Sequence, residues 1–185
     1  MKKIFTLLTA LLVVYSMFAQ NGFQASIEIE GGKGLDKIQN FSFGAKIVAG
    51  YKFIDLITIG AGVGYEYLDG LYYVDMEGKS STDARSVLQV LGRIKVNLTK
   101  TKISPYIGCD LGRSFSLGNY PIKMANGFFY EPGVGCDFGL NSGQGIYFFL
   151  GYNSQKYAYE SFTDVTEKTR IVFSGQFKVH LGFRF

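Results

Sequence analysis

The sequence predicts an all-β protein, an eight-stranded antiparallel up-and-down transmembrane barrel that follows an export signal. Three observations support this fold class: a signal-like amino terminus, a composition rich in glycine and aromatic residues, and repeated segments in which apolar and polar residues alternate. Alternation with a period of two places apolar side chains on one face of a strand and polar side chains on the other.

The amino terminus has the features of a secretory signal peptide. Lys2 and Lys3 form a basic start, residues 4–18 are mostly apolar, and Ala19 is a small residue suited to cleavage. We expect residues 1–19 to be removed, which leaves residues 20–185 as one domain. Loss of the two lysines lowers the net charge from +4 to +2, a balance that argues against nucleic acid as a partner.

The composition favours strands over helices. The 185 residues include 24 Gly, 13 Tyr and 17 Phe but no Trp, and the longest apolar run after the signal covers only residues 146–150. A membrane-spanning helix needs about 20 apolar residues. A chain of this kind can cross a membrane only as a closed barrel, which leaves no backbone group unpaired in lipid.

Eight segments show the alternation. In chain order they are residues 23–30, 41–52, 57–67, 88–98, 107–115, 128–139, 145–157 and 170–185. The first alternates isoleucine with glutamate and serine, and the second alternates aromatic and aliphatic residues with Lys46 and small residues. In the third, apolar residues alternate mainly with glycine, and in the fourth they alternate with Arg93, Lys95 and other polar residues.

The later segments follow the same rule. The fifth and sixth set aliphatic residues, aromatic residues and cysteine against glycine, serine and acidic residues. The seventh is less regular, because Tyr147 and Phe149 fall on its polar face. The eighth is the most regular, and it runs to the terminal aromatic residue, Phe185.

Longer and shorter connections alternate between these segments. The longer ones lie at residues 31–40, 69–84, 118–126 and 158–169, and the shorter ones at residues 53–56, 99–103 and 141–144. Barrels of the outer membrane have short periplasmic turns and longer extracellular loops. An even number of strands then places both termini at the periplasmic end.

The two faces differ too much for a soluble barrel with an apolar interior. One face is almost wholly aliphatic and aromatic, whereas the other carries charges among glycine and serine. Exposing the apolar face to water while burying the charged face in an apolar interior would be unstable. We therefore expect lipid outside, with a soluble β-domain as the alternative. The predicted interior polar network comprises Glu28, Glu30, Lys46, Glu66, Arg93, Lys95, Asp110, Glu131, Asp137, Lys178 and His180.

The interior charges have both signs, which predicts compensated ion pairs that plug the barrel rather than a path for one kind of ion. Closure of the barrel is expected to place Glu28 and Glu30 level with His180 and Lys178. The turn at residues 99–102 is expected to bring Arg93 diagonally near Asp110. A narrow gated pore is the alternative interpretation.

Catalytic and metal sites have little support. His180 is the only histidine, and we interpret it as a hydrogen-bonded interior side chain, because a catalytic triad needs a serine and a carboxylate beside it. With one His and two Cys a dedicated metal site is not expected, and no cofactor is predicted. The glycines at residues 60–64 lack the last glycine of a dinucleotide-binding fingerprint, where Tyr65 stands.

The two cysteines are predicted to lie opposite each other across one hairpin. Cys109 and Cys136 both fall on apolar faces, and a loop centred between residues 122 and 123 would pair them. Such a pair lies within disulfide range in an oxidising compartment. Two free, lipid-facing thiols are equally compatible with the pattern.

The signal, the alternating strands and the terminal Phe185 together resemble the small OmpA/OmpX-like barrels and the related Bacteroidetes-type outer-membrane barrel domains. The resemblance implies a monomer in the cell outer membrane, with lipid and the barrel assembly machinery as partners and Phe185 as an assembly signal. It also implies a non-enzymatic protein whose extracellular loops bind a ligand not identified by the sequence, or support membrane integrity. A small porin-like pore and a lipid-modifying enzyme are the alternatives.

Overall fold

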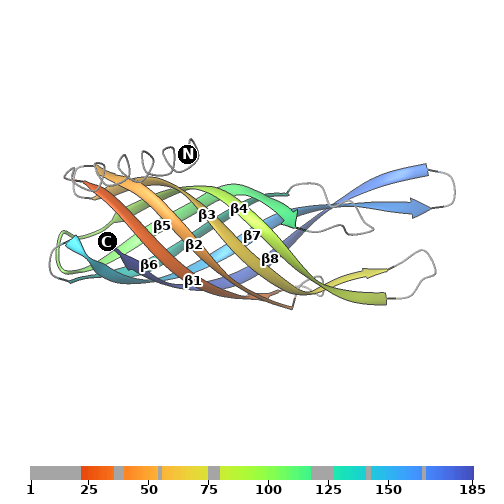
Figure 1. The fold of residues 1–185 in the computed structure, drawn as a ribbon, viewed down its shortest axis with the longest axis horizontal. Coiled ribbons are helices and arrows are strands. Elements are labelled where there is room, and N and C mark those ends of the chain that lie inside the picture. The colour runs from red at the N-terminus through yellow and green to blue at the C-terminus, as the bar shows by residue number, and fades with distance from the viewer. Residues whose placement is uncertain are drawn as a thin grey trace, which may run out of the picture.

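The computed structural model describes residues 22–35, 40–53, 56–74, 80–117, 127–140, 143–163 and 166–185; within these ranges, it describes only the backbone of residues 70–74, 80–83, 157–163 and 166–172. The described residues form eight strands (Figure 1). They are β1 (Phe23–Gly34), β2 (Phe41–Phe53), β3 (Ile57–Val74), β4 (Ser80–Asn97), β5 (Ile103–Leu117), β6 (Gly127–Gly139), β7 (Gly145–Thr163) and β8 (Thr166–Arg184).

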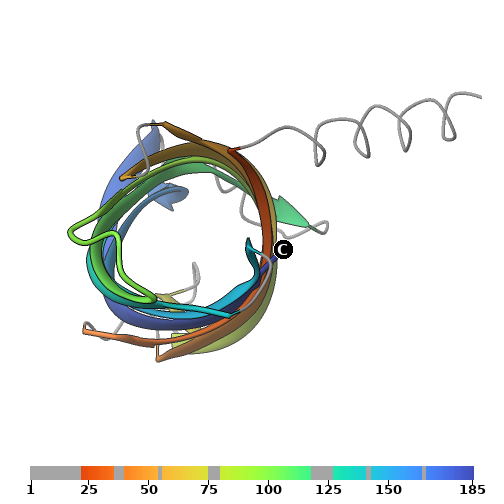
Figure 2. The same ribbon diagram turned by 90° about the vertical axis from the view of Figure 1, so that its left-hand side faces the viewer.

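The strands form a closed barrel in which each strand pairs antiparallel with its neighbour in the chain. The first and last strands complete the ring, from Ser26 opposite Arg184 to Gly34 opposite Gln176. Figure 2, a view along the barrel, shows the unbroken ring. The predicted fold class, an eight-stranded up-and-down barrel, is confirmed. Among the described residues, no helix is long and apolar enough to cross a membrane.

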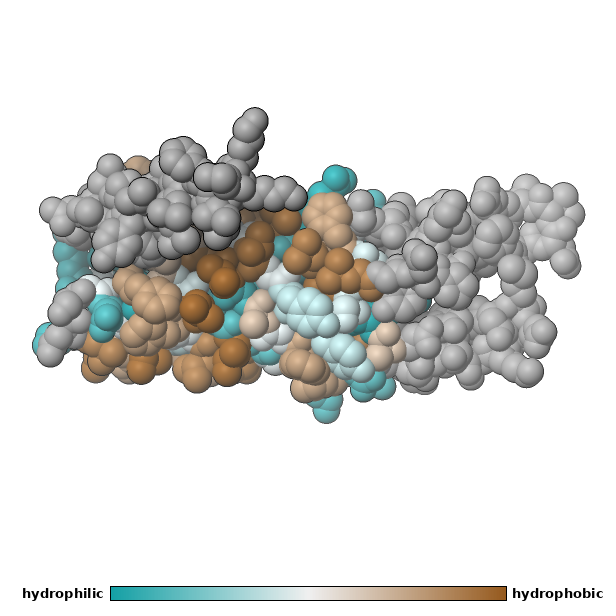
Figure 3. Space-filling model, viewed as in Figure 1, coloured by the Kyte–Doolittle hydropathy of each residue, from teal (hydrophilic) through white to brown (hydrophobic). Residues whose placement is uncertain are grey.

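The exterior of the barrel is apolar. Large aliphatic and aromatic side chains lie exposed on every strand, including Ile29 (61% exposed), Ile103 (60%) and Phe173 (62%). They form much of the brown surface of the barrel in Figure 3. A water-soluble barrel has the opposite arrangement, with apolar side chains inside, so this wall is built to contact lipid.

The two ends of the barrel differ. Short connections after β2, β4 and β6 and both ends of the described chain lie at one end, which we call the turn end (Figure 1). At the opposite end, the loop end, two pairs of strands extend beyond the wall. The pairing of β3 with β4 continues to Val74 opposite Ser80, whereas β2 stops pairing with β3 at Asp69. We call these two extensions the β3–β4 ribbon and the β7–β8 ribbon.

The β7–β8 ribbon is the longer extension. Its pairing reaches Thr163 opposite Thr166, although β6 stops pairing with β7 at Gln155 and β1 stops pairing with β8 at Gln176. The expected long loops at residues 69–84 and 158–169 were therefore wrong, because most of these residues are paired strands. A ribbon beyond the lipid has no need for an apolar outer face, so its sequence lacks the alternation that marks a membrane strand.

Inward-facing glycines make room for large side chains in this narrow lumen. A Cβ atom at Gly64 would lie 2.8 Å from Lys46 Cγ, and one at Gly112 would lie 2.8 Å from the Phe129 ring. The glycines at residues 60–64 thus leave room for neighbouring atoms. This agrees with their mismatch to the dinucleotide-binding fingerprint.

Candidate functional site: the charged interior

The structure brings the predicted polar residues together inside the barrel. Ten of them have at most 9% of their surface exposed, and the Arg93 side chain is 13% exposed. These residues come from every strand except β7. All of them take part in ion pairs with one another or with Arg184. Arg184 is a member of this network that the sequence analysis did not name.

Two lysines lie at the centre of the network. Lys46 Nζ lies 2.7 Å from Glu30 Oε2, 3.5 Å from Glu131 Oε2 and 3.6 Å from Asp110 Oδ2. Lys178 Nζ lies 3.4 Å from Glu30 Oε1 and also contacts Glu66. Because Glu30 on β1 and Glu131 on β6 share Lys46 on β2, the ion pairs cross the lumen instead of following its wall.

Arg93 connects the central group to the turn end. Its guanidinium donates from Nε and Nη2 to Asp110, at 2.6 and 2.7 Å, and from Nη2 to Glu28 Oε2 at 3.0 Å. Arg93 lies directly opposite Asp110 in the β4–β5 pairing, where a diagonal position was expected. The register expected between the first and last strands was also wrong, by two residues. In the structure, Glu30 faces His180 and Glu28 faces Gly182.

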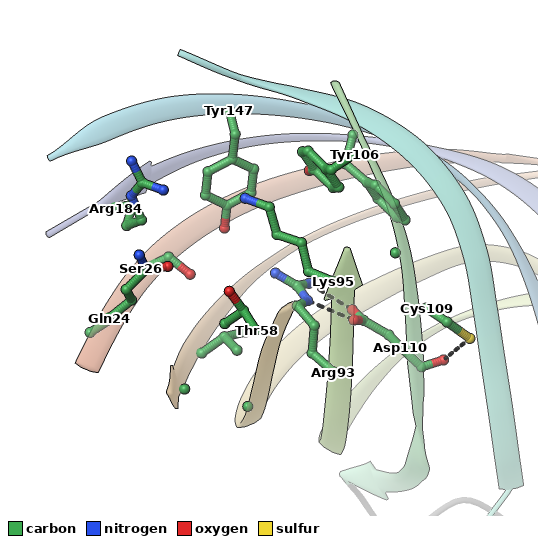
Figure 4. A pocket seen from close by; sticks show the side chains of 16 residues that line it. Gln24, Ser26, Thr58, Arg93, Lys95, Tyr106, Cys109, Asp110, Tyr147 and Arg184 are labelled. Carbon is green, nitrogen blue, oxygen red and sulfur yellow. Dashed lines mark hydrogen bonds and ion pairs between the residues drawn. The ribbon is translucent and has the colours of Figure 1, made fainter. Parts of the chain in front are cut away.

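A third group lies nearest the turn end. Lys95 Nζ is 2.5 Å from Asp137 Oδ2, and Arg184 Nη1 is 2.8 Å from the same oxygen. The Lys95 ammonium also lies 4.2 Å from the centre of the Tyr106 ring and 5.1 Å from that of Tyr147. Figure 4 shows Lys95 extending toward Tyr147, with Arg93 and Asp110 beside it.

His180 is enclosed by carboxylates. Its Nε2 forms a hydrogen bond with Glu131, and its Nδ1 lies 3.4 Å from Glu28 Oε2 and 3.5 Å from Glu30 Oε2. The Phe149 ring packs edge-on against the imidazole, with ring centres 5.2 Å apart. A triad histidine must contact a hydroxyl or thiol nucleophile. The ring nitrogens of His180 instead face three acids, so the arrangement does not resemble a hydrolytic site.

Glu30, Glu131 and His180 also have the atom types of a metal site. One ligand atom from each lies within 4.8 Å of the other two. However, the Lys46 ammonium already lies 2.7 Å from Glu30 and 3.5 Å from Glu131. A metal cation there would meet a buried positive charge at close range, so the geometry favours an ion-pair cluster.

Comparisons with known proteins agree with this architecture. No family model matches the chain, and no curated protein matches it in sequence. Among solved structures, the chain is similar to the outer membrane protein OprG from Pseudomonas aeruginosa, with a TM-score of 0.63, 11% identity, and 89% of this chain and 96% of that chain covered.

Two further structures have the same fold. The outer membrane protein AlkL in lipid bilayers matches with a TM-score of 0.58 and 12% identity over 90% of both chains. Neisserial surface protein A matches with a TM-score of 0.52 and 16% identity over 89% of this chain and 96% of that chain. The chain has the fold of the eight-stranded outer-membrane barrels. The apolar exterior agrees with this fold. The prediction of a small eight-stranded outer-membrane barrel is confirmed.

Aromatic side chains add a layer to this outer-membrane barrel that the sequence analysis missed. Tyr106, Tyr147 and Phe149 are each 4% exposed and form one buried cluster in the lumen. The Tyr106 and Phe149 rings are nearly parallel, with centres 5.9 Å apart, and the Tyr147 hydroxyl donates to Glu28. The irregular pattern of the seventh segment was the available signal, because Tyr147 and Phe149 follow its inward phase.

A second apolar cluster lies among the interior charges of the outer-membrane barrel. It consists of Val48, Leu91 and Phe129, which are at most 5% exposed. The charged network thus adjoins two apolar clusters, and together they fill the lumen.

The predicted pairing of the cysteines was wrong. Cys109 lies opposite Pro132 and Cys136 lies opposite Pro105, and both thiols are free. The β5–β6 register differs from the expected one by four residues. Since the faces of a strand alternate with a period of two, this shift leaves both cysteines on the outer face, and the alternation could not reveal it.

Phe185 lies where the barrel closes. Its backbone N–H donates to the Ala25 carbonyl at 2.8 Å, and its ring packs against Phe183 with ring centres 5.1 Å apart. Its role as an assembly signal stays a prediction. The signal peptide also stays a prediction, since residues 1–19 lie outside the described residues.

Proposed function

We propose that the chain is an integral outer-membrane protein with a non-conducting interior, which acts through the two ribbons that it presents at its loop end. The observation that carries this proposal is the filling of the lumen. Lys46 and Lys178 pair with acids from β1, β3, β5 and β6, and two buried apolar clusters share the lumen with them.

The filled interior argues against the pore. Continuous conduction needs a wet path from end to end, and an eight-stranded barrel has just enough room for its own side chains. The charges of the predicted network are paired, so moving one to admit an ion would leave its partner unpaired at a cost of several kcal/mol.

The ribbons favour an interaction role. Both continue past the point at which neighbouring strands stop pairing, so among the described residues neither ribbon has a strand partner on its outer edges beyond the barrel wall. Free edges of this kind accept extended segments of partner proteins. One of the similar structures is, by its name, a surface protein. The proposed partners are outer-membrane lipid, the assembly machinery and an extracellular ligand. The proposed oligomeric state is a monomer.

The lipid-modifying enzyme has less support. The only histidine of the sequence is enclosed by Glu28, Glu30 and Glu131 inside the lumen. A group in that position cannot reach the lipid that surrounds the barrel.

Planar-bilayer recording tests the closed interior. We expect no steady conductance from the wild-type barrel or from a variant in which a two-residue turn replaces residues 157–172. Ion-selective conductance from the wild type that is altered by Lys46→Gln and kept in the ribbon deletion would overturn the proposal in favour of a pore.

Epitope tags test the orientation. A tag inserted between Thr163 and Thr166 should bind antibody on intact cells, whereas a tag inserted between Leu140 and Gly143 should bind only after the outer membrane is opened. The reverse result would place the ribbons in the periplasm and contradict the proposed display.

A further inference from the structure

A cavity of about 240 Å³ lies at the turn end of the barrel. Four cationic side chains line this chamber, together with one carboxylate. The cations are Lys52, Lys100, Lys102 and Arg184, and the carboxylate is Asp137. We call this space the turn-end chamber. Its charge is strongly positive, in contrast to the balanced network deeper in the barrel.

Asp137 is the one acid among the described residues that line the chamber, and it is already paired. Asp137 Oδ2 lies 2.5 Å from Lys95 Nζ and 2.8 Å from Arg184 Nη1, so two cations already share it. The Nε atom of Arg184 is buried and has no hydrogen-bond partner among the described residues. A buried guanidinium N–H without an acceptor is costly, so an acceptor entering the chamber would stabilise it.

Neutral donors complete the lining. Asn97, Thr99, Thr101 and Ser104 line the same chamber. Asn97 Nδ2 donates to Ser104 Oγ at 3.1 Å, and Ser104 Oγ donates to the Thr99 carbonyl at 2.7 Å. These bonds hold the β4–β5 turn against the chamber wall. The lysine side chains of this turn therefore extend from a backbone that hydrogen bonds fix in place.

The chamber adjoins a second cavity at Arg184. This smaller cavity, of about 50 Å³, is also lined by Lys95, Arg93 and Tyr147 (Figure 4). Arg93 there is bound to Glu28 and Asp110, and the Tyr147 hydroxyl is bound to Glu28. A ligand can therefore enter from the turn end and stop at this layer, which fits a binding site rather than a passage.

We propose that the turn-end chamber binds a phosphate group, either as free inorganic phosphate or as part of a lipid headgroup. Lysine binds phosphate as a point charge, and the guanidinium of arginine matches its oxygens. Pockets for drug-sized ligands measure about 300–1,000 Å³, so this chamber suits a small, highly charged group. The inference does not depend on what the ribbons bind.

Calorimetric titration of the purified barrel in a maltoside detergent tests the proposal, because this detergent carries no phosphate. Inorganic phosphate is the first probe and dihexanoyl phosphatidic acid, a water-soluble lipid, is the second. We expect the Lys52→Gln/Lys102→Gln variant to bind phosphate at least about tenfold more weakly than the wild type, because two of the four lining charges are lost.

The matched control is Lys33→Gln/Lys156→Gln, which removes two lysines near the loop end and leaves the same net charge. It should bind like the wild type. Binding of inorganic phosphate alone identifies a soluble ligand, and tighter binding of the lipid, with displacement of phosphate, identifies a headgroup. Absence of binding by both probes, or equal loss in the two double variants, would overturn the proposal.

Discussion

At the scale of single residues, Arg93 forms more hydrogen bonds to carboxylates than any other interior cation among the described residues. It donates to Asp110 and to Glu28, and its loss would leave two carboxylates without that partner. We expect Arg93→Ala to lower the free energy of unfolding by about 3–5 kcal/mol. Urea unfolding in lipid vesicles, followed by circular dichroism, measures this change. Arg113→Ala, at an exposed position, should change it by less than about 0.5 kcal/mol. If the two variants lowered the free energy of unfolding equally, the buried ion pairs of Arg93 would contribute no more to stability than an exposed arginine.

Glycine at position 182 is required by the ring beside it. A Cβ atom there would overlap the Tyr147 ring, whereas a Cβ atom at Gly31 would lie 3.9 Å from its nearest neighbour. We expect Gly182→Ala to destabilise the barrel by about 1–3 kcal/mol through overpacking. Gly31→Ala should remain within about 0.5 kcal/mol of the wild type. In the Tyr147→Ala background, Gly182→Ala should cost less than it does in the wild type; an equal cost in both backgrounds would show that the strain lies elsewhere.

At the scale of elements, β8 closes the ring by pairing with β1. Deleting Phe185 removes a backbone hydrogen bond to Ala25 and a ring packed on Phe183, but it leaves the other β1–β8 pairs intact. We therefore expect the deletion to lower the amount of barrel in the outer membrane several-fold while leaving refolding into detergent unaffected. Heat-modifiable mobility on gels reports both quantities. A normal amount in the membrane would rule out Phe185 as an assembly signal.

The sequence predicted the parts of each strand that lie in the wall but not the ribbons. In the wall, lipid requires an apolar residue at every second position, so the alternation revealed which side chains face inward, Lys46 and Glu131 included. The ribbons have no such requirement, and their residues had the composition of loops. Glu28 and Glu30 were expected near His180, and both contact it, although the β1–β8 register is shifted by two residues. Its third partner, Glu131 on β6, reaches it across the lumen, and strand pairing in the sequence could not reveal that contact.

At the scale of the whole molecule, the exterior determines the solvent in which the barrel is stable. Val134 lies mid-strand on β6 and is 57% exposed, whereas Leu140 lies at the turn end and is 49% exposed. We expect Val134→Arg to cost about 2–4 kcal/mol in lipid vesicles and Leu140→Arg about 0–1 kcal/mol, because the cost of a charge depends on depth in the bilayer. Unfolding titrations in vesicles compare the two. Similar small costs at both positions would indicate that water covers the wall.

The crossing ion pairs have a consequence for how the barrel forms. Glu30 and Lys178 are separated by 148 positions in the chain, yet their side chains meet in the lumen. A single hairpin inserted into lipid would carry such charges with no partner, and an isolated charge in hydrocarbon is expensive. Partly assembled sheets are therefore strongly disfavoured in the bilayer, and the charges find their partners only as the last strand meets the first. Membrane entry and ring closure become a single cooperative event, with few stable intermediates along the way.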